Sequence, residues 1–479
     1  MRNRPGTRLR IDRAKGEPLM RSRTGVYRIV RGLMPVLLAT TALVPLGEAR
    51  AQSLLDAFVS TYNSNPDLLG QRARLRQVDE TVNQALAGWR PVIRGQGELG
   101  LNKQNSSLRN PREQDLQPRT YALSVTQPLF RGGKTVAQTR SAEADVLAER
   151  AALIDREQTV LLGTVSSYSD VVRDDATVIL RRNNVRVLQE QLAATNARFR
   201  VGELTRTDVA QAESRLSRSQ SDLIAAEAQA ANSRAAYQRV VGARPGAQLQ
   251  EAPLLNTVPT TEDQAIAIGL EAAPRVVAAK HRITSANYAI DNAVGDLLPT
   301  AQIVGTVSRA FDQQVKSDHL YSYSLRGQVT VPLYQNGAEY SRVRQAKQLH
   351  GQRQNELDSA RRQSAEAVIR AFRTFEASRA RVESIGAQLR AAQVALDGVR
   401  QEAQVGSRTT LDVLNAEQEA LDAQVQLVSA RRDMVVGHYS LMSELGLLTA
   451  RQLRLPVEYY DEEKYYRNVR DSWFGLGTK

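Results

Sequence analysis

The residues that most often carry chemistry in proteins are absent or scattered in this 479-residue chain. It contains no cysteine, which excludes disulfides, thiolate metal sites, a cysteine nucleophile and a lipid-modified cysteine. The four histidines, His281, His319, His350 and His438, lie far apart in the sequence. It has no His-Glu-x-x-His motif, Gly-rich phosphate loop or Gly-x-Ser-x-Gly elbow. The sequence therefore predicts that the protein is not an enzyme and holds no metal or cofactor.

Most carboxylates stand beside an arginine, as in Glu149-Arg150, which is typical of solvated helix faces. Asp208 and Asp412 differ, because they recur at equivalent places in the two halves of the chain, just after short turns. At the start of a helix, an acidic side chain can cap the helix or complement its dipole. What else these two residues do depends on the elements that position them.

The N-terminal segment has the pattern of a secretory signal. Residues 1–51 carry 11 Lys and Arg against 3 Asp and Glu, and so most of the net charge of +13. An apolar run, Gly32 to Pro45, is followed by Ala49-Arg50-Ala51, a small-x-small cleavage site. The run is shorter than the ~20 residues of a membrane-spanning helix. We expect residues 1–51 to be a cleaved signal peptide, with Met20 as the true start.

The chain after the signal is only mildly basic, which argues against a nucleic-acid partner. No later stretch approaches 18 consecutive apolar residues. The exported protein is therefore expected either to be soluble or to span a membrane as strands.

The two halves of the chain repeat each other at an offset of 204 residues. Val125 to Phe130 corresponds to Val329 to Tyr334, and Asp208-Val209 corresponds to Asp412-Val413. Further upstream, Pro66 and Pro91 match Pro274 and Pro299 at an offset of 208. A repeat of this length predicts two copies of one structural unit. We expect a first repeat over residues 52–250, a second over 251–448, and a C-terminal segment over 449–479.

Each half contains a proline-free segment long enough for one helix of ~100 Å, at residues 134–200 and 338–404. Apolar residues recur in them every seven positions, at Val171, Val178, Val185 and Leu192 and at Phe375, Val382, Leu389 and Leu396. A heptad repeat predicts helices that pack along their length as a coiled coil. After a Val-Gly turn, a shorter helix is expected to return over residues 207–241 and 410–445.

Two pairs of strands are expected at the other end of each long helix. Tyr121, Leu123 and Val125 alternate with small or polar residues, as do Tyr321, Tyr323 and Leu325. The expected pairs are residues 91–101 with 120–130, and 300–311 with 321–332, separated by polar loops near 102–119 and 312–320. Each strand is long enough to cross a bilayer when tilted.

Four strands cannot leave open edges in lipid, because unpaired backbone groups there cost several kcal/mol each. One chain supplies only half of the roughly eight strands that a barrel needs, whereas three chains supply about 12. The polar faces would line a water-filled lumen, continuous with a tube of helices.

With this organisation the sequence resembles the TolC family of outer-membrane channel proteins of Gram-negative bacteria. The resemblance spans residues 53–448 and includes the duplicated strands, long helices and Val-Gly turns, and the run from Val405 to Leu414. It implies an α+β membrane protein, a homotrimer with a 12-stranded transmembrane β-barrel, four strands per chain, continuous with a long periplasmic α-helical coiled-coil barrel. It also implies a location in the outer membrane, in contact with its lipid, and passive export of drugs, secreted proteins or both. The implied partners are a periplasmic adaptor and an inner-membrane transporter.

By this resemblance, Asp412 lies where family members place acidic rings that constrict the periplasmic entrance. The adjacent position, often a second Asp, is Asn415 here. Three carboxylates that converge on one axis would repel each other and attract cations. Arg408 and Asp208 match positions that link neighbouring hairpins in similar proteins.

The two turns resemble the tips that meet the adaptor in this family. The residues concerned are Val201, Gly202, Glu203 and Leu204 in the first half and Val405, Gly406 and Ser407 in the second. Both glycines are also expected simply to end a helix. The aromatic-rich C-terminal segment is expected either to pack around the middle of the helical barrel or to serve as a disordered or partner-binding tail. The competing class is an exported periplasmic coiled-coil scaffold or adaptor, which explains the heptads and the signal but not the paired strands.

Overall fold

The structure is a computed structural model that describes residues 52–105, 113–255 and 258–477. The expected signal peptide lies outside the described residues. The helices of the first half are α1 Leu54–Ser64, α2 Pro66–Leu86, η1 Ala87–Trp89, α3 Lys134–Arg200 and α4 Arg206–Val241. Those of the second half are α5 Glu262–Ala272, α6 Pro274–Val294, η2 Gly295–Leu297, α7 Ala338–Gln404, α8 Thr410–Glu444 and α9 Lys464–Val469. The strands are β1 Val92–Leu99, β2 Asn102–Asn105, β3 Glu113–Leu116, β4 Arg119–Arg131, β5 Thr300–Phe311 and β6 His319–Thr330.

Local sequence signals set the ends of several helices. Pro66 and Pro274 occupy the first turn of α2 and α6, where a missing N–H costs nothing. Asn65 caps α2, because its side chain accepts hydrogen bonds from Asp67 N and Leu68 N. Both 67-residue helices, α3 and α7, follow a glycine with positive φ, Gly133 or Gly337.

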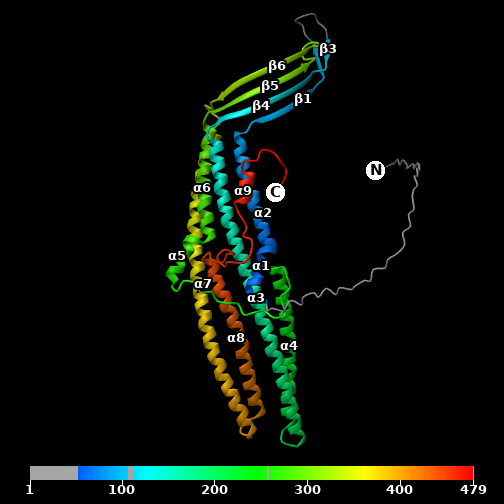
Figure 1. Ribbon diagram of the computed structural model, residues 1–479, viewed down its shortest axis with the longest axis vertical. Coiled ribbons are helices and arrows are strands. Elements are labelled where there is room, and N and C mark those ends of the chain that lie inside the picture. The colour runs from blue at the N-terminus through cyan, green and yellow to red at the C-terminus, as the bar shows by residue number, and fades with distance from the viewer. Residues whose placement is uncertain (1–51, 106–112, 256–257, 478–479) are drawn as a thin grey trace, which may run out of the picture. The chain divides into compact units, whose positions relative to one another are not determined.

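Four strands form one antiparallel sheet in the order β1-β4-β5-β6. The central pair, β4 with β5, joins the first half of the chain to the second. Because β4 leads directly into α3, the sheet adjoins the start of α3 (Figure 1). The turn after Arg200 lies at the opposite end of α3, away from the sheet.

The region expected to be a polar loop near residues 102–119 contains an additional hairpin. β2 and β3 pair antiparallel, from Asn102 opposite Leu116 to Asn105 opposite Glu113. The expectation of a plain loop was wrong, because polar residues pair by backbone hydrogen bonds as readily as apolar ones when no face has to be buried.

The long helices pack side by side in the order α7, α8, α3, α4, with α6 against α3 and α7 and with α2 against α3. The residues of the two expected heptad seams are all buried or half-buried, and Val171 is fully buried. The largest apolar cluster lies midway along α3, around Phe58, Tyr168, Tyr237 and Tyr439. Tyr168 Oη donates hydrogen bonds to the carbonyl oxygens of Gln52 (2.8 Å) and Gln250 (2.7 Å), which fixes the two connecting segments on α3.

Within the described ranges, every helix is too short or too polar to cross a bilayer.

Candidate functional site

The four-stranded sheet has one apolar and one polar face. The register places Leu123 of β4 beside Val307 of β5, and Val307 beside Tyr323 of β6, so these side chains share a face. This face is exposed, with Tyr323 at 77% and Leu325 at 80%. Its apolar members are Ile93, Tyr121, Leu123, Val125, Ile303, Val307, Tyr321, Tyr323, Leu325 and Val329. An exposed apolar surface of this extent marks contact with a partner or with a membrane.

The opposite face of the sheet is predominantly polar. Ser124 of β4, Thr306 of β5 and Ser324 of β6 lie in one row across it. Gln302 Nε2 donates a hydrogen bond to Gln328 Oε1 at 3.0 Å on the same face. The alternation along each strand therefore separates a surface suited to apolar surroundings from one suited to water.

Both outer edges of this sheet are free within the described chain, because β1 pairs only with β4 and β6 pairs only with β5. An edge strand presents a row of unpaired N–H and C=O groups, which is a template for another strand. With one apolar face and two free edges, the sheet is built to extend sideways into further strands.

The two helical turns expected to act as tips have the same backbone geometry. Gly202 and Gly406 both have φ of +82°, the left-handed conformation that glycine adopts most easily. Glu203 N donates to Arg198 O at 3.0 Å, and Ser407 N donates to Glu402 O at 2.9 Å. This is the Schellman pattern of helix ends. Val201 and Val405 next to these glycines are 74% and 81% exposed, so each turn carries an uncovered apolar side chain.

Asp208 and Asp412 each take part in a capping box at the start of a return helix. Asp412 Oδ2 accepts hydrogen bonds from Thr409 N (3.0 Å) and Thr409 Oγ1 (2.8 Å). Thr205 holds Asp208 in the same way, at 2.9 and 2.7 Å. These hydrogen bonds lower the pKa of both carboxyl groups below the ordinary value. Both residues are half-buried, and their ionised side chains are fixed near the turns.

Arg408 and Asp208 contact their own hairpins in this single chain. Arg408 Nε pairs with Glu402 Oε2 at 2.8 Å, and this bond raises the pKa of the arginine. The two hairpins are joined by other side chains, since Arg215 Nη2 of α4 donates to Asn415 Oδ1 of α8 at 2.9 Å and, further from the turns, Arg432 Nε of α8 donates to Asp170 Oδ1 of α3 at 2.9 Å. The sequence did not reveal the role of Arg215, since its partner lies 200 residues away and neither residue belongs to a motif.

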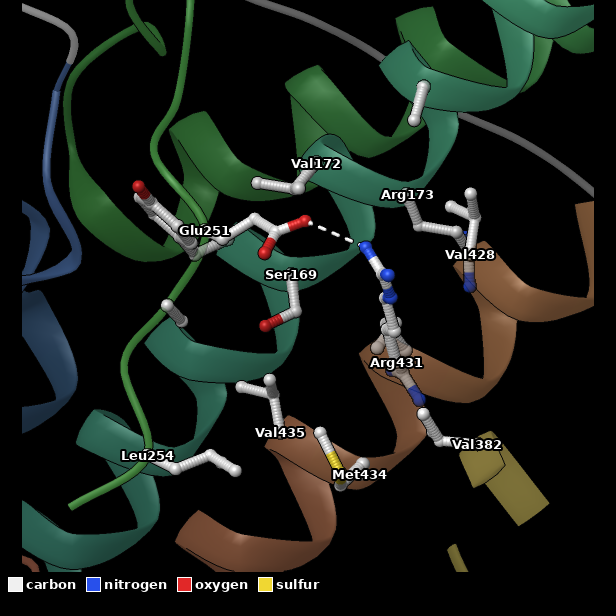
Figure 2. Close-up of a pocket in the computed structure, with 14 residues that line it drawn as sticks. Ser169, Val172, Arg173, Glu251, Leu254, Val382, Val428, Arg431, Met434 and Val435 are labelled. Carbon is white, nitrogen blue, oxygen red and sulfur yellow. Dashed lines mark hydrogen bonds and ion pairs between the residues drawn. The ribbon is translucent and has the colours of Figure 1, made fainter. Parts of the chain in front are cut away.

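A cavity of 310 Å³ lies between α3 and α8, beside the connector that follows α4 (Figure 2). Its walls are largely apolar, with Val172, Val428 and Val435 among them. Glu251 and Arg431 form an ion pair of 3.4 Å there, shown as a dashed line in Figure 2. The cavity offers space for an apolar group, and its polar groups are mostly engaged in ion pairs on the helices.

The described part of the C-terminal segment packs on α2. Tyr465 Oη donates to Glu80 Oε1 at 2.7 Å, and Tyr460 N donates to Tyr62 Oη at 3.0 Å. The guanidinium of Arg72 lies 4.4 Å from the ring centre of Tyr62 and 5.1 Å from that of Tyr460. Aromatic and cation–π contacts therefore hold this segment against the helices.

Across the described ranges, no group of three or more His, Asp or Glu side chains is arranged to hold a metal ion. The four histidines lie apart in the structure as well, on α6, β6, α7 and α8. His438 is buried, and its Nε2 accepts a hydrogen bond from Leu255 N at 3.1 Å, so it serves packing.

Comparison with known proteins shows a match to the family model described as outer membrane efflux protein, over residues 59–243 and 266–447. The chain is 35% identical over 456 residues to the outer membrane efflux protein BepC of Brucella suis biovar 1 (strain 1330). This alignment covers 95% of this chain and 98% of BepC. It is 25% identical over 435 residues to the proteases secretion protein PrtF of Dickeya chrysanthemi, which covers 87% of this chain and 93% of PrtF.

Among solved structures, the fold is similar to that of the outer membrane channel CmeC of Campylobacter jejuni, with a TM-score of 0.74. The two share 16% sequence identity, and the similarity covers 87% of this chain and 89% of CmeC. At this identity the similarity speaks for the fold alone.

Proposed function

The chain belongs to the outer membrane efflux protein family, and from this premise we propose that three copies assemble into one continuous channel-tunnel. The protein is an outer-membrane channel of an export system, and the proteins of this family are channels and not enzymes.

The two-faced sheet with its free edges is the observation that carries the proposal. Its apolar face, with Leu325 80% exposed, would be costly to leave in water at about 25 cal/mol per Å². In lipid that cost disappears. The N–H and C=O groups on the open edges of β1 and β6 would then lack hydrogen-bond partners, and each such group costs several kcal/mol in lipid. Both costs vanish only when the edges pair with strands of other copies.

In the proposed trimer, β6 of one copy lies antiparallel to β1 of the next. Four strands from each of three copies make a 12-stranded barrel, in the size range that encloses water. The polar face lines the lumen, and α3, α4, α7 and α8 continue it as a helical tunnel into the periplasm. The equal lengths of α3 and α7 support a duplicated architecture with repeats at residues 52–250 and 251–448 and a C-terminal segment at 449–479.

At the periplasmic end, we assign the entrance to Asp412, Asn415, Arg408 and Asp208. The capping boxes support this, because they hold ionised carboxylates in place close to the turns. In the trimer, Asp412 forms a ring of three that attracts cations, and the Arg215–Asn415 hydrogen bond holds the two hairpins of each copy together. Arg408 and Asp208 join neighbouring hairpins when the entrance is closed.

The two turns are proposed to dock a periplasmic adaptor, which connects the channel to an inner-membrane transporter that supplies the energy. Val201 and Val405 support this role, since each is an uncovered apolar side chain beside a rigid glycine turn. Gly202, Glu203, Leu204, Gly406 and Ser407 complete the docking surface. The cargo consists of drugs, secreted proteins or both, since one relative is named for efflux and another for protease secretion.

Disulfide cross-linking between β1 and β6 tests the assembly, because the chain has no cysteine of its own. Within one copy β1 and β6 are three strand spacings apart, about 14 Å, which is beyond the reach of a disulfide. Gln96→Cys on β1 is combined in turn with Ser322→Cys, Ser324→Cys or Gln328→Cys on β6, all on the polar face. Gln96→Cys with Tyr323→Cys is the control, because these two side chains point to opposite faces.

We expect at least one same-face pair to give covalent species of up to three chains after oxidation in membranes, and the control pair to give none. Single chains in all combinations would refute the barrel and favour an exported scaffold.

A further inference from the structure

The charged residues of the sheet differ between its two faces. On the apolar face, Arg309 lies 4.6 Å from the ring centre of Phe311 and 4.7 Å from that of Tyr321, and Arg119 pairs with Asp312 at 3.6 Å. These groups gather at the loop end of the strands, where aromatic and basic side chains of membrane proteins meet the interface. The charge of Arg309 is therefore stabilised by two aromatic rings, and that of Arg119 is paired with a carboxylate.

On the polar face, Arg94 and Arg326 are left without such neighbours, whereas Arg131 at the helix end of β4 donates a hydrogen bond to Thr135 Oγ1 at 3.5 Å. Arg94 of β1 lies in the row of Ser124, and Arg326 of β6 lies beside Val304. Both side chains are exposed, and neither forms an ion pair or cation–π contact with any residue that the structure describes. Guanidinium groups stay protonated at all physiological pH values, so both charges are permanent.

The two arginines lie at nearly the same level of the sheet. Arg326 of β6 lies opposite Val304 of β5, which is in register with Thr126 of β4 and, through it, with Val92 of β1. Val92 is two residues from Arg94 along β1. Two residues of a strand correspond to about 7 Å, which is within the Debye length of about 8 Å at physiological salt. When β6 of one copy pairs with β1 of the next in a register that keeps these levels, the two guanidinium groups act on the lumen as one cluster.

The acidic residue of this face is too far away to neutralise them. Glu98 is the one carboxylate that the described strands of this sheet place on the polar face. It is four residues further along β1 than Arg94, or about 14 Å, toward the loop end. At this distance in water its field is largely screened. Besides Arg131, the part of the lumen nearest the helices therefore carries the two uncompensated positive charges of Arg94 and Arg326 in each chain.

We propose that Arg94 and Arg326 form a ring of six guanidinium groups inside the barrel, which makes the outer part of the channel select for anions. The inference rests on the proposed trimeric channel and deepens it. Rings of arginine or lysine in pores favour anions, as acidic rings favour cations. Guanidinium groups pair with carboxylates and phosphates through two hydrogen bonds, so the favoured solutes are small inorganic anions and acidic organic molecules. The channel then combines a cation-attracting entrance at Asp412 with an anion-attracting outer segment.

The experiment measures the reversal potential of the purified protein in planar bilayers under a KCl gradient, which gives the chloride-to-potassium permeability ratio. Wild type is compared with R94Q/R326Q, with the charge-conserving R94K/R326K, and with R309Q as a control on the opposite face. Coulomb's law with screening, for six charges roughly 10 Å from the axis, predicts that R94Q/R326Q lowers the ratio by about twentyfold in 0.1 M salt. R94K/R326K and R309Q should leave it near the wild-type value.

The difference should shrink in 1 M salt, where the Debye length falls to about 3 Å. If the double variant does not insert, R326Q alone reports on half of the ring, with an expected change of about fivefold. Open channels with an unchanged ratio in the arginine variants, or an equal loss in R309Q, would overturn the anion ring while leaving the channel intact. A wild type that inserts but never conducts would instead overturn the proposed function.

Discussion

The joint between the sheet and the helices makes a sharp prediction about two adjacent glycines. Gly132 and Gly133 connect β4 to α3, and both have positive φ, +62° and +78°. A Cβ on Gly132 would collide with the carbonyl oxygen of Gly295 in η2 and come within 3.0 Å of Leu298 Cβ. A Cβ on Gly133 would meet nothing within 4 Å. Gly132→Ala and Gly133→Ala are therefore a matched pair that differ mainly in contact with η2.

The magnitudes follow from these two terms. Either alanine is strained at positive φ, at a cost of about 1–2 kcal/mol. Gly132→Ala must in addition displace the backbone of η2, and overpacking of this kind costs about 1–3 kcal/mol. We expect a loss of about 1–2 kcal/mol per chain for Gly133→Ala and about 2–5 kcal/mol for Gly132→Ala.

The assay is the thermal unfolding midpoint of the helices, followed by circular dichroism of detergent-purified protein, together with the yield of inserted protein. Gly132→Ala should melt clearly below Gly133→Ala and insert in lower yield, because β4, β5, the start of α3 and the end of α6 meet there. Equal midpoints and yields for the two variants would refute the close packing of this joint.

Three further predictions concern charge and docking. Burial raises the pKa of Asp79 to about 6, and neither of its carboxylate oxygens is hydrogen-bonded in the described chain. Above pH 6 the folded protein therefore holds a buried charge that destabilises it. Asp79→Asn removes this charge and should stabilise the fold by up to about 3 kcal/mol above pH 6. The gain should vanish near pH 4, where the folded wild type is protonated, and Asp397→Asn on an exposed part of α7 should change melting curves little at either pH. Asp412→Asn should raise single-channel conductance and weaken block by a multivalent cation, whereas wild-type block should persist as the pH is lowered into the acid range, because the hydrogen bonds from Thr409 lower the pKa of Asp412. Gly406→Trp, whose Cβ would meet nothing within 4 Å but is strained at a φ of +82°, should reduce export in cells and leave the conductance of the purified protein unchanged, since the strain is confined to the turn.

The long helices and the main strands could be predicted because their signals are local and strong. A proline-free stretch ended by Val-Gly places α3 and α7, and the alternation around Tyr121 and Tyr323 places β4 and β6. The β2–β3 hairpin was missed, because nearly all of its residues are polar and so leave no alternating apolar pattern.

The site was predictable only in part, because side-chain pairing between distant segments leaves no trace in one sequence. Capping of return helices by Asp208 and Asp412 was one of the two roles considered from the sequence, and the structure has capping boxes at both. Their role at the entrance stays a prediction, since it depends on neighbouring copies. The Arg215–Asn415 contact could not be predicted, because it follows from how α4 and α8 pack.

The most direct test of the central claim is the conductance of the detergent-purified protein in planar bilayers, with and without a multivalent cation on the periplasmic side. Discrete channels that the cation blocks from that side are the predicted result, with the block weakened in Asp412→Asn. A protein that is soluble without detergent and forms no channels would contradict the account.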